Sequence, residues 1–121
     1  MRRVAALYDI HGNLPALEAT LAAIDAAGID DIVVGGDIVL GPMPGETLDA
    51  LLALGKRARF LSGNCDRLVV EAFDGRLSAD LPGGVQKPIV WTAEQLVRKQ
   101  RDFLAALPLT LEAMRRYDEL Q

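Results

Sequence analysis

The sequence has little cysteine, little histidine and no long apolar run. Cys65 is the one cysteine and His11 is the one histidine among 121 residues. A single cysteine excludes an intrachain disulfide framework and favours a reducing compartment, the cytoplasm. The amino-terminal apolar run, Val4 to Leu7, is too short for a signal-peptide core or a membrane span. We therefore expect a cytoplasmic protein with no membrane partner.

Positive charge is also scarce. Lysine and arginine total 13 against 17 acidic residues, which gives a formal net charge of -4. Nucleic-acid-binding proteins usually cluster lysine and arginine to neutralise phosphates, so this composition predicts no specific nucleic-acid partner. Hydrophobic residues make up 50% of the chain and charged residues 25%, as in ordinary globular proteins. The length allows one domain with a modest core.

Three short, mostly apolar segments that we predict to be strands each end in polar residues. The runs cover residues 4–8, 32–34 and 58–61, and they are followed by Asp9, by Gly35-Gly36-Asp37 and by Ser62-Gly63-Asn64. Leucines at helical spacing predict helices over 14–27 and 45–54, between these runs. Strand–helix units in series need right-handed crossovers and so predict an α/β fold with a mostly parallel sheet and flanking helices. All three polar turns then meet at one sheet edge, where such sheets bind ligands.

The rest of the chain is less regular. Glycines and prolines spread over residues 74–90 predict a long loop. Thr92, followed by Gln95 three positions later, matches a capping box and predicts a helix from there to about Ala106. Alternating apolar and polar residues over 109–114 predict a weak strand.

The polar residues at the strand ends are candidate metal ligands. Asp9 and His11 are two positions apart, so on an extended segment their side chains point to one side. Asp37 follows two glycines, which let a backbone approach an ion closely, and Asn64 offers a neutral oxygen suited to Mg or Mn. Taken singly, each residue has a structural alternative, such as a hydrogen-bonded pair or a turn-capping aspartate. Together, two carboxylates, an imidazole and an amide in one cleft predict a divalent cation.

The blocks that contain these residues resemble a known family. Asp9-Ile10-His11-Gly12-Asn13, Gly35-Gly36-Asp37 and Gly63-Asn64-Cys65-Asp66 are similar to the first three blocks of the calcineurin-like metallophosphoesterases, especially the small bacterial and archaeal phosphodiesterase branch. The resemblance covers residues 1 to about 112. It implies part of an αββα sandwich and a two-metal centre that activates water to hydrolyse a phosphate ester of a small molecule.

The resemblance also implies a role for each residue. Asp9 and His11 would bind the first ion, Asp37 would bridge both ions and Asn64 would bind the second. Mn is the metal expected first, with Fe, Ni, Zn or Mg as alternatives. The catalytic candidates that it implies are Asp37, Asn64, Cys65 and Asp66.

Two departures from the family pattern affect the expected activity. Cys65 stands where the family commonly has a histidine that assists the leaving group, and a thiol is a poorer acid for that task. The family's later Gly-His and Gly-His-x-His blocks have no counterpart, since His11 is the one histidine. We therefore expect residues 1–121 to form a truncated domain with weak activity.

An apolar sheet face left open in such a domain would favour a homo-oligomer. Two alternatives to a hydrolase stay open. One is a non-catalytic metal- or phosphate-binding module that acts through a partner, and the other is an α/β domain without any ion.

Overall fold

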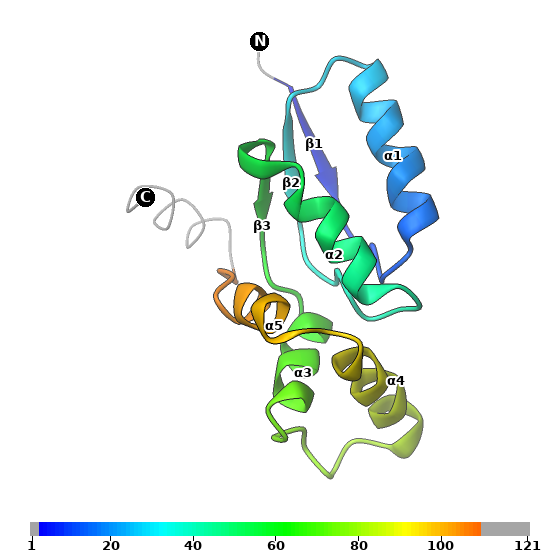
Figure 1. Ribbon diagram of the computed structural model, residues 1–121, viewed down its shortest axis with the longest axis vertical. Coiled ribbons are helices and arrows are strands. Elements are labelled where there is room, and N and C mark those ends of the chain that lie inside the picture. The colour runs from blue at the N-terminus through cyan, green and yellow to red at the C-terminus, as the bar shows by residue number, and fades with distance from the viewer. Residues whose placement is uncertain (1–2, 110–121) are drawn as a thin grey trace.

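The structure, a computed structural model, describes residues 3–109. Its elements follow in the order β1 (Val4–Leu7), α1 (Leu14–Ala26), β2 (Asp31–Val34), α2 (Pro44–Leu52), the 3-10 turn η1 (Gly55–Arg57), β3 (Ala58–Phe60), α3 (Asn64–Phe73), α4 (Gly83–Glu94) and α5 (Arg98–Ala105) (Figure 1). The strands form one parallel sheet in the order β1-β2-β3. The predicted α/β class and parallel sheet are confirmed, and so are the first two helices.

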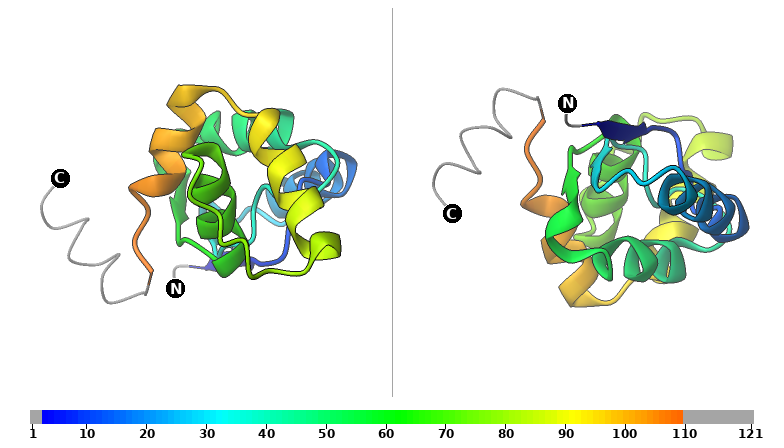
Figure 2. Two further views of the ribbon diagram at one scale, coloured as in Figure 1. Left: turned by 90° about the horizontal axis from the view of Figure 1, so that it is seen from below. Right: turned by 90° about the horizontal axis from the view of Figure 1, so that it is seen from above.

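One face of the sheet carries the core. The parallel register aligns Ala5 with Ile32 and Ile32 with Ala58, so these side chains share a face. Ile32 is buried there together with Leu17 of α1 and Leu48 of α2. Figure 2 shows α1 and α2 on the same side of the sheet. The apolar stripes of the two predicted helices are therefore what covers this face.

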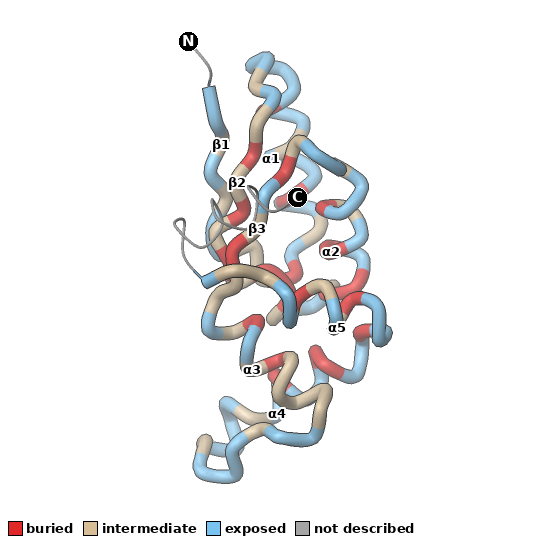
Figure 3. Tube along the Cα trace, turned by 90° about the vertical axis from the view of Figure 1, so that its left-hand side faces the viewer, coloured by how far each residue is buried: buried red, intermediate tan, exposed pale blue. Residues whose placement is uncertain are grey.

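The opposite face is more open. Val4 and Tyr8, which alternate with the core-facing residues of β1, are 54% and 60% exposed. Figure 3 shows β1 as a strand of exposed and intermediate residues. Self-association through this face stays a prediction.

The last three helices form a second group beyond the carboxyl ends of the strands (Figure 1). α3 packs against both α4 and α5. Phe60 of β3 meets Phe103 of α5 edge to face, with ring centroids 5.2 Å apart, so α5 is tied to the sheet. No helix within residues 3–109 combines the length and the apolar character that a membrane span requires.

The loop predicted over residues 74–90 is wrong in its second half, because α4 begins at Gly83 and contains Pro88. Ile89, Thr92 and Ala93 of α4 are buried at helical spacing. Burial of this face against α3 outweighs the local preference of proline and glycine for turns.

The helix predicted over residues 92–106 ends where predicted, since α5 ends at Ala105, but its predicted start at Thr92 is wrong. Thr92 lies inside α4 and is 1% exposed, and a new helix, α5, begins at Arg98. There the side chain of Gln100 accepts a hydrogen bond from the Val97 amide at 3.0 Å, which is the role that the sequence predicts for Gln95. Apart from Leu109, the strand predicted over 109–114 lies outside the described residues.

Candidate metal centre

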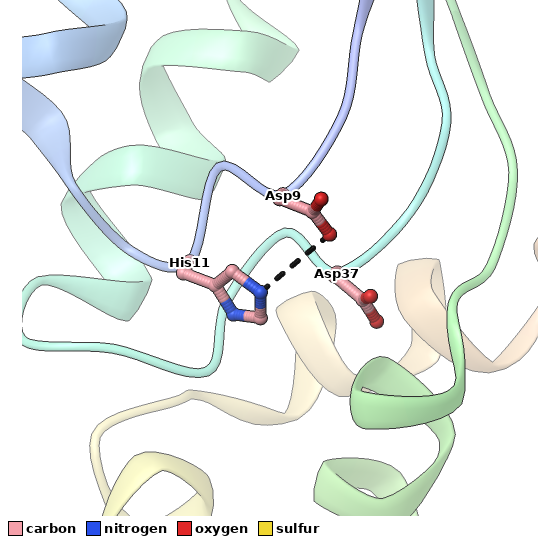
Figure 4. Close-up of side chains that lie close together, drawn as sticks. All are labelled: Asp9, His11 and Asp37. Atoms are coloured by element: carbon pink, nitrogen blue, oxygen red, sulfur yellow. Dashed lines mark ion pairs between the residues drawn. The ribbon is translucent and has the colours of Figure 1, made fainter.

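Asp9 and His11 follow β1, and Asp37 follows β2 at the neighbouring position of the same sheet edge. One ligand atom from each of the three side chains lies within 4.8 Å of those from the other two (Figure 4). Asp9 is exposed, whereas His11 and Asp37 are half-buried. The structure thus brings together three of the four residues that the sequence marked as metal ligands.

The backbone at these three positions is unusual. Asp9, His11 and Asp37 have φ angles of 56°, 49° and 55°, and they are the non-glycine residues with positive φ in the described chain. A left-handed conformation costs roughly 1–2 kcal/mol for a residue with a Cβ. Hydrogen bonds from the His11 amide to the Asp37 carbonyl, 2.9 Å, and from the Gly12 amide to the Ile38 carbonyl, 2.8 Å, hold the two loops together. Strain of this kind is typical of functional sites.

The imidazole of His11 is oriented by a backbone group. Its Nδ1 lies 3.1 Å from the Leu40 carbonyl oxygen. A carbonyl can only accept, so Nδ1 carries a proton, and in the neutral form of the ring Nε2 is the nitrogen that keeps its lone pair. Nε2 lies 3.7 Å from Asp9 Oδ1. Such second-nitrogen hydrogen bonds are usual for metal-binding histidines, but residue types in a sequence do not reveal a backbone partner of this kind.

The three side chains fit one divalent ion. Bonds of about 2.0–2.2 Å place two ligands of the same ion at most about 4.4 Å apart, so small side-chain movements suffice here. Within residues 3–109 no lysine or arginine forms an ion pair with Asp9 or Asp37. Two carboxylates this close repel each other by about 1 kcal/mol in water, and by more where they are partly buried. A cation between them would remove that repulsion.

Asn64 and Cys65 open α3 beside Asp37. Asn64 is the first residue of the helix and is exposed. The Cys65 amide donates a hydrogen bond to Asp37 Oδ1 at 3.2 Å. Burial raises the pKa of the Cys65 thiol, and the charge of Asp37 and a hydrogen bond to it raise it further. The thiol is therefore protonated at neutral pH.

Asp66 differs from the other candidates because it is 0% exposed. Its two carboxylate oxygens accept hydrogen bonds from four backbone amides, those of Asp37, Ile38, Val39 and Gly63. Burial raises the pKa of this carboxyl, and the amide hydrogen bonds lower it in part. A carboxylate enclosed in this way does not contact a substrate, so any effect of Asp66 on the site passes through the backbone.

Comparisons with known proteins found a similar sequence and a similar structure. No family model matches the sequence. An uncharacterized protein of Methanocaldococcus jannaschii is 34% identical over 113 residues, which cover 90% of this chain and 43% of that protein. The crystal structure of a metallophosphoesterase from Sphaerobacter thermophilus matches with a TM-score of 0.67 and 37% identity, over 88% of this chain and 42% of that one.

The chain therefore spans less than half the length of either relative. It is similar, in sequence and in fold, to part of a metallophosphoesterase, and its Asp9, His11 and Asp37 cluster could hold a metal ion.

Proposed function

We propose that this chain is part of a calcineurin-like metallophosphoesterase and that its sheet edge holds the metal ions for hydrolysis of a phosphate ester. The convergence of Asp9, His11 and Asp37 from two neighbouring loops carries the proposal. The similarity to the Sphaerobacter thermophilus metallophosphoesterase supports it independently. The single cysteine favours the cytoplasm as the place of action.

Each residue has a task in this proposal. Asp9 and Nε2 of His11 would hold one ion, and Asp37 would offer its carboxylate to that ion and to a second. Asn64, at the start of α3, would offer an amide oxygen to the second ion. Bound divalent ions, with Mn as the first choice, would orient the phosphate and make a bound water nucleophilic.

Cys65 weakens the proposed reaction without preventing it. Its thiol interacts with Asp37, and Cys65 stands where the family commonly has a histidine that assists the leaving group. Because its pKa is raised, the protonated thiol gives up its proton reluctantly and makes a poor general acid. We therefore propose a slow hydrolase.

A second candidate function is a metal-binding module that does not hydrolyse its ligand. It is favoured by the sparse ligand set of the second ion. Oδ1 of Asp37 already accepts the Cys65 amide, and Asn64 is a neutral ligand. A transition-metal ion that has so few protein ligands is bound only weakly.

Hydrolysis of bis(4-nitrophenyl) phosphate by the purified chain, with Mn and with chelator, tests the proposal. We expect Mn-dependent turnover at least roughly a hundredfold slower than that of the Sphaerobacter thermophilus enzyme, because much transition-state stabilisation is missing. Asp37→Asn should abolish the turnover.

Asp74→Asn is the matched control, since Asp74 lies at the other end of α3 and pairs with Arg101. It should keep the turnover. Hydrolysis that is unaffected by chelator or by Asp37→Asn would contradict the proposal. Metal binding without hydrolysis would favour the binding module instead.

A further inference from the structure

Two loops meet behind the proposed metal ligands. One follows β2 and contains Asp37, and the other follows β3 and leads into α3 at Asn64. A Cβ added to Gly36 would lie 2.6 Å from the backbone nitrogen of Gly63. The backbones of the two loops are therefore in contact at these two glycines. No side chain separates the loops at this point.

The buried carboxylate of Asp66, in the first turn of α3, accepts hydrogen bonds from backbone amides of both loops. Its Oδ2 accepts the amides of Asp37 at 2.8 Å and Gly63 at 3.0 Å. Its Oδ1 accepts the amides of Ile38 at 2.8 Å and Val39 at 3.3 Å. A carboxylate in the first turn of a helix ordinarily serves its own helix. Three of these four hydrogen bonds instead go to the neighbouring loop.

A return contact closes the connection, since Asp37 Oδ1 accepts the amide of Cys65 from α3. Asp66 therefore fixes the main chain of Asp37, while the side chain of Asp37 fixes α3. Asn64 lies between Gly63 and Cys65, the two residues whose amides make these contacts. The backbone on the two sides of Asn64 is thus held by two carboxylates, those of Asp66 and Asp37.

We propose that Asp66 is a positioning residue that couples Asp37 to Asn64 in the metal centre. The inference rests on the proposed function, since it assigns a residue that organises the proposed ligands. Asp37 is in a left-handed conformation, at φ 55°, that isolated chains avoid. The amide hydrogen bonds of residues 37 to 39 to Asp66 hold that conformation, and with it the direction of the metal-binding carboxylate.

The chemistry requires a carboxylate at this position. All four partners are N–H donors, and an ionised carboxylate is the side chain that accepts on both atoms without donating. Asparagine has the same shape but would turn N–H groups toward two of the four amides. Asp66→Asn therefore breaks half of the connection without changing the packed volume.

The test compares the Zn affinity of the wild-type chain with that of Asp66→Asn, by competition with a chromophoric chelator. We expect Asp66→Asn to bind Zn about ten- to a hundredfold more weakly, the range found for residues that orient metal ligands. Asp74→Asn, the same substitution at the other end of the helix, should stay within about twofold of wild type. Melting in chelator reports whether each variant is folded.

The outcomes separate the two proposals. Tight Zn binding by wild type and equally tight binding by folded Asp66→Asn would overturn the positioning role and leave the proposed function intact. A wild-type chain that binds no Zn would overturn the proposed function, and the positioning role with it.

Hydrogen exchange of the wild-type chain covers the case in which Asp66→Asn does not fold. Zn should slow exchange at the amides of residues 37 to 39 and 63 more than at Gly75, whose amide bonds to Ala72 at the far end of α3. Equal slowing at both places would overturn the inference.

Discussion

Two acidic clusters of this molecule differ in how their charges are neutralised. At the carboxyl end of α3, Arg101 donates to both oxygens of Asp74, from Nε at 3.0 Å and from Nη2 at 2.7 Å, and from Nη1 to Asp102 at 3.0 Å. At the sheet edge, Asp9 and Asp37 converge on the imidazole of His11, and no lysine or arginine of residues 3–109 forms an ion pair with either carboxylate. The first cluster contains its own cation, and the second offers ligands to one from outside.

The backbones of the two clusters differ in the same sense. All three residues of the sheet-edge cluster have a strained, positive φ, and the residues around Arg101 do not. Backbone strain and charge repulsion occur together at the sheet edge, where a bound ion could compensate them. Neither occurs around Arg101, where the chain supplies its own positive charge. The difference supports the proposed metal site at the sheet edge, whereas the α3–α5 contact neutralises its charges within the chain.

The largest expected effect is the response to metal. Zn at about a hundred times its dissociation constant should stabilise the fold by about 2.7 kcal/mol, a rise in Tm of roughly 10 °C. Asp37→Asn should lose most of this rise because a carboxylate ligand is removed. Thermal melting with chelator and with excess Zn measures it. For Asp74→Asn we expect a lower Tm in chelator but the same increase in Tm with Zn as for wild type. If Zn raised the Tm of Asp37→Asn and Asp74→Asn equally, the proposed difference between the two clusters would be contradicted.

The next effect concerns turnover. Cys65→His should raise Mn-dependent hydrolysis by about tenfold to a hundredfold, because an imidazolium donates a proton near neutral pH far better than this thiol. Cys65→Ser, which changes the thiol without adding an acid, should give no rise. Initial rates on bis(4-nitrophenyl) phosphate measure both variants. Similar rates for the two variants would show that residue 65 does not act as an acid.

A smaller effect should appear without any metal. In chelator at pH 8, Asp9→Asn should stabilise the fold by up to about 1 kcal/mol, since it removes the repulsion from Asp37 and asparagine tolerates a positive φ. Denaturant unfolding measures the change. Asp80→Asn, at an exposed loop position, is the control and should have little effect. If the Asp9→Asn variant were less stable than wild type, the carboxylates of Asp9 and Asp37 would not be destabilising the fold by repulsion.

The smallest effect belongs to the self-neutralised cluster. The hydrogen bonds and charge of Arg101 hold the pKa of the Asp74 carboxyl below its ordinary value. A lowered pKa in the folded state adds stability above the ordinary carboxyl pKa of about 4, and this stability is lost as the pH falls from there through the lowered value. The advantage of wild type over Asp74→Asn should therefore be constant above about pH 5 and shrink below pH 4. Chelator melts across this range measure it, and a difference that grows on acidification would contradict it.

The sequence alone was enough to predict the sheet and to name the candidate ligands. Apolar runs that end in polar residues, separated by leucines at helical spacing, were enough to place β1, α1, β2, α2 and β3. In these segments local preference and burial agree, because each strand is short and each helix has one clear apolar face. Parallel order then made Asp9, His11 and Asp37 neighbours at one edge.

Only the tertiary structure decided the rest. α4 exists despite Pro88 because Ile89 and Ala93 are buried by packing that no local pattern reveals. The tautomer of His11 depends on the Leu40 carbonyl, and the task of Asp66 depends on amides 27 to 29 positions away in the chain. Every residue except proline has the same backbone donor and acceptor. A sequence can therefore indicate which side chains form a site, but not which main-chain atoms orient them.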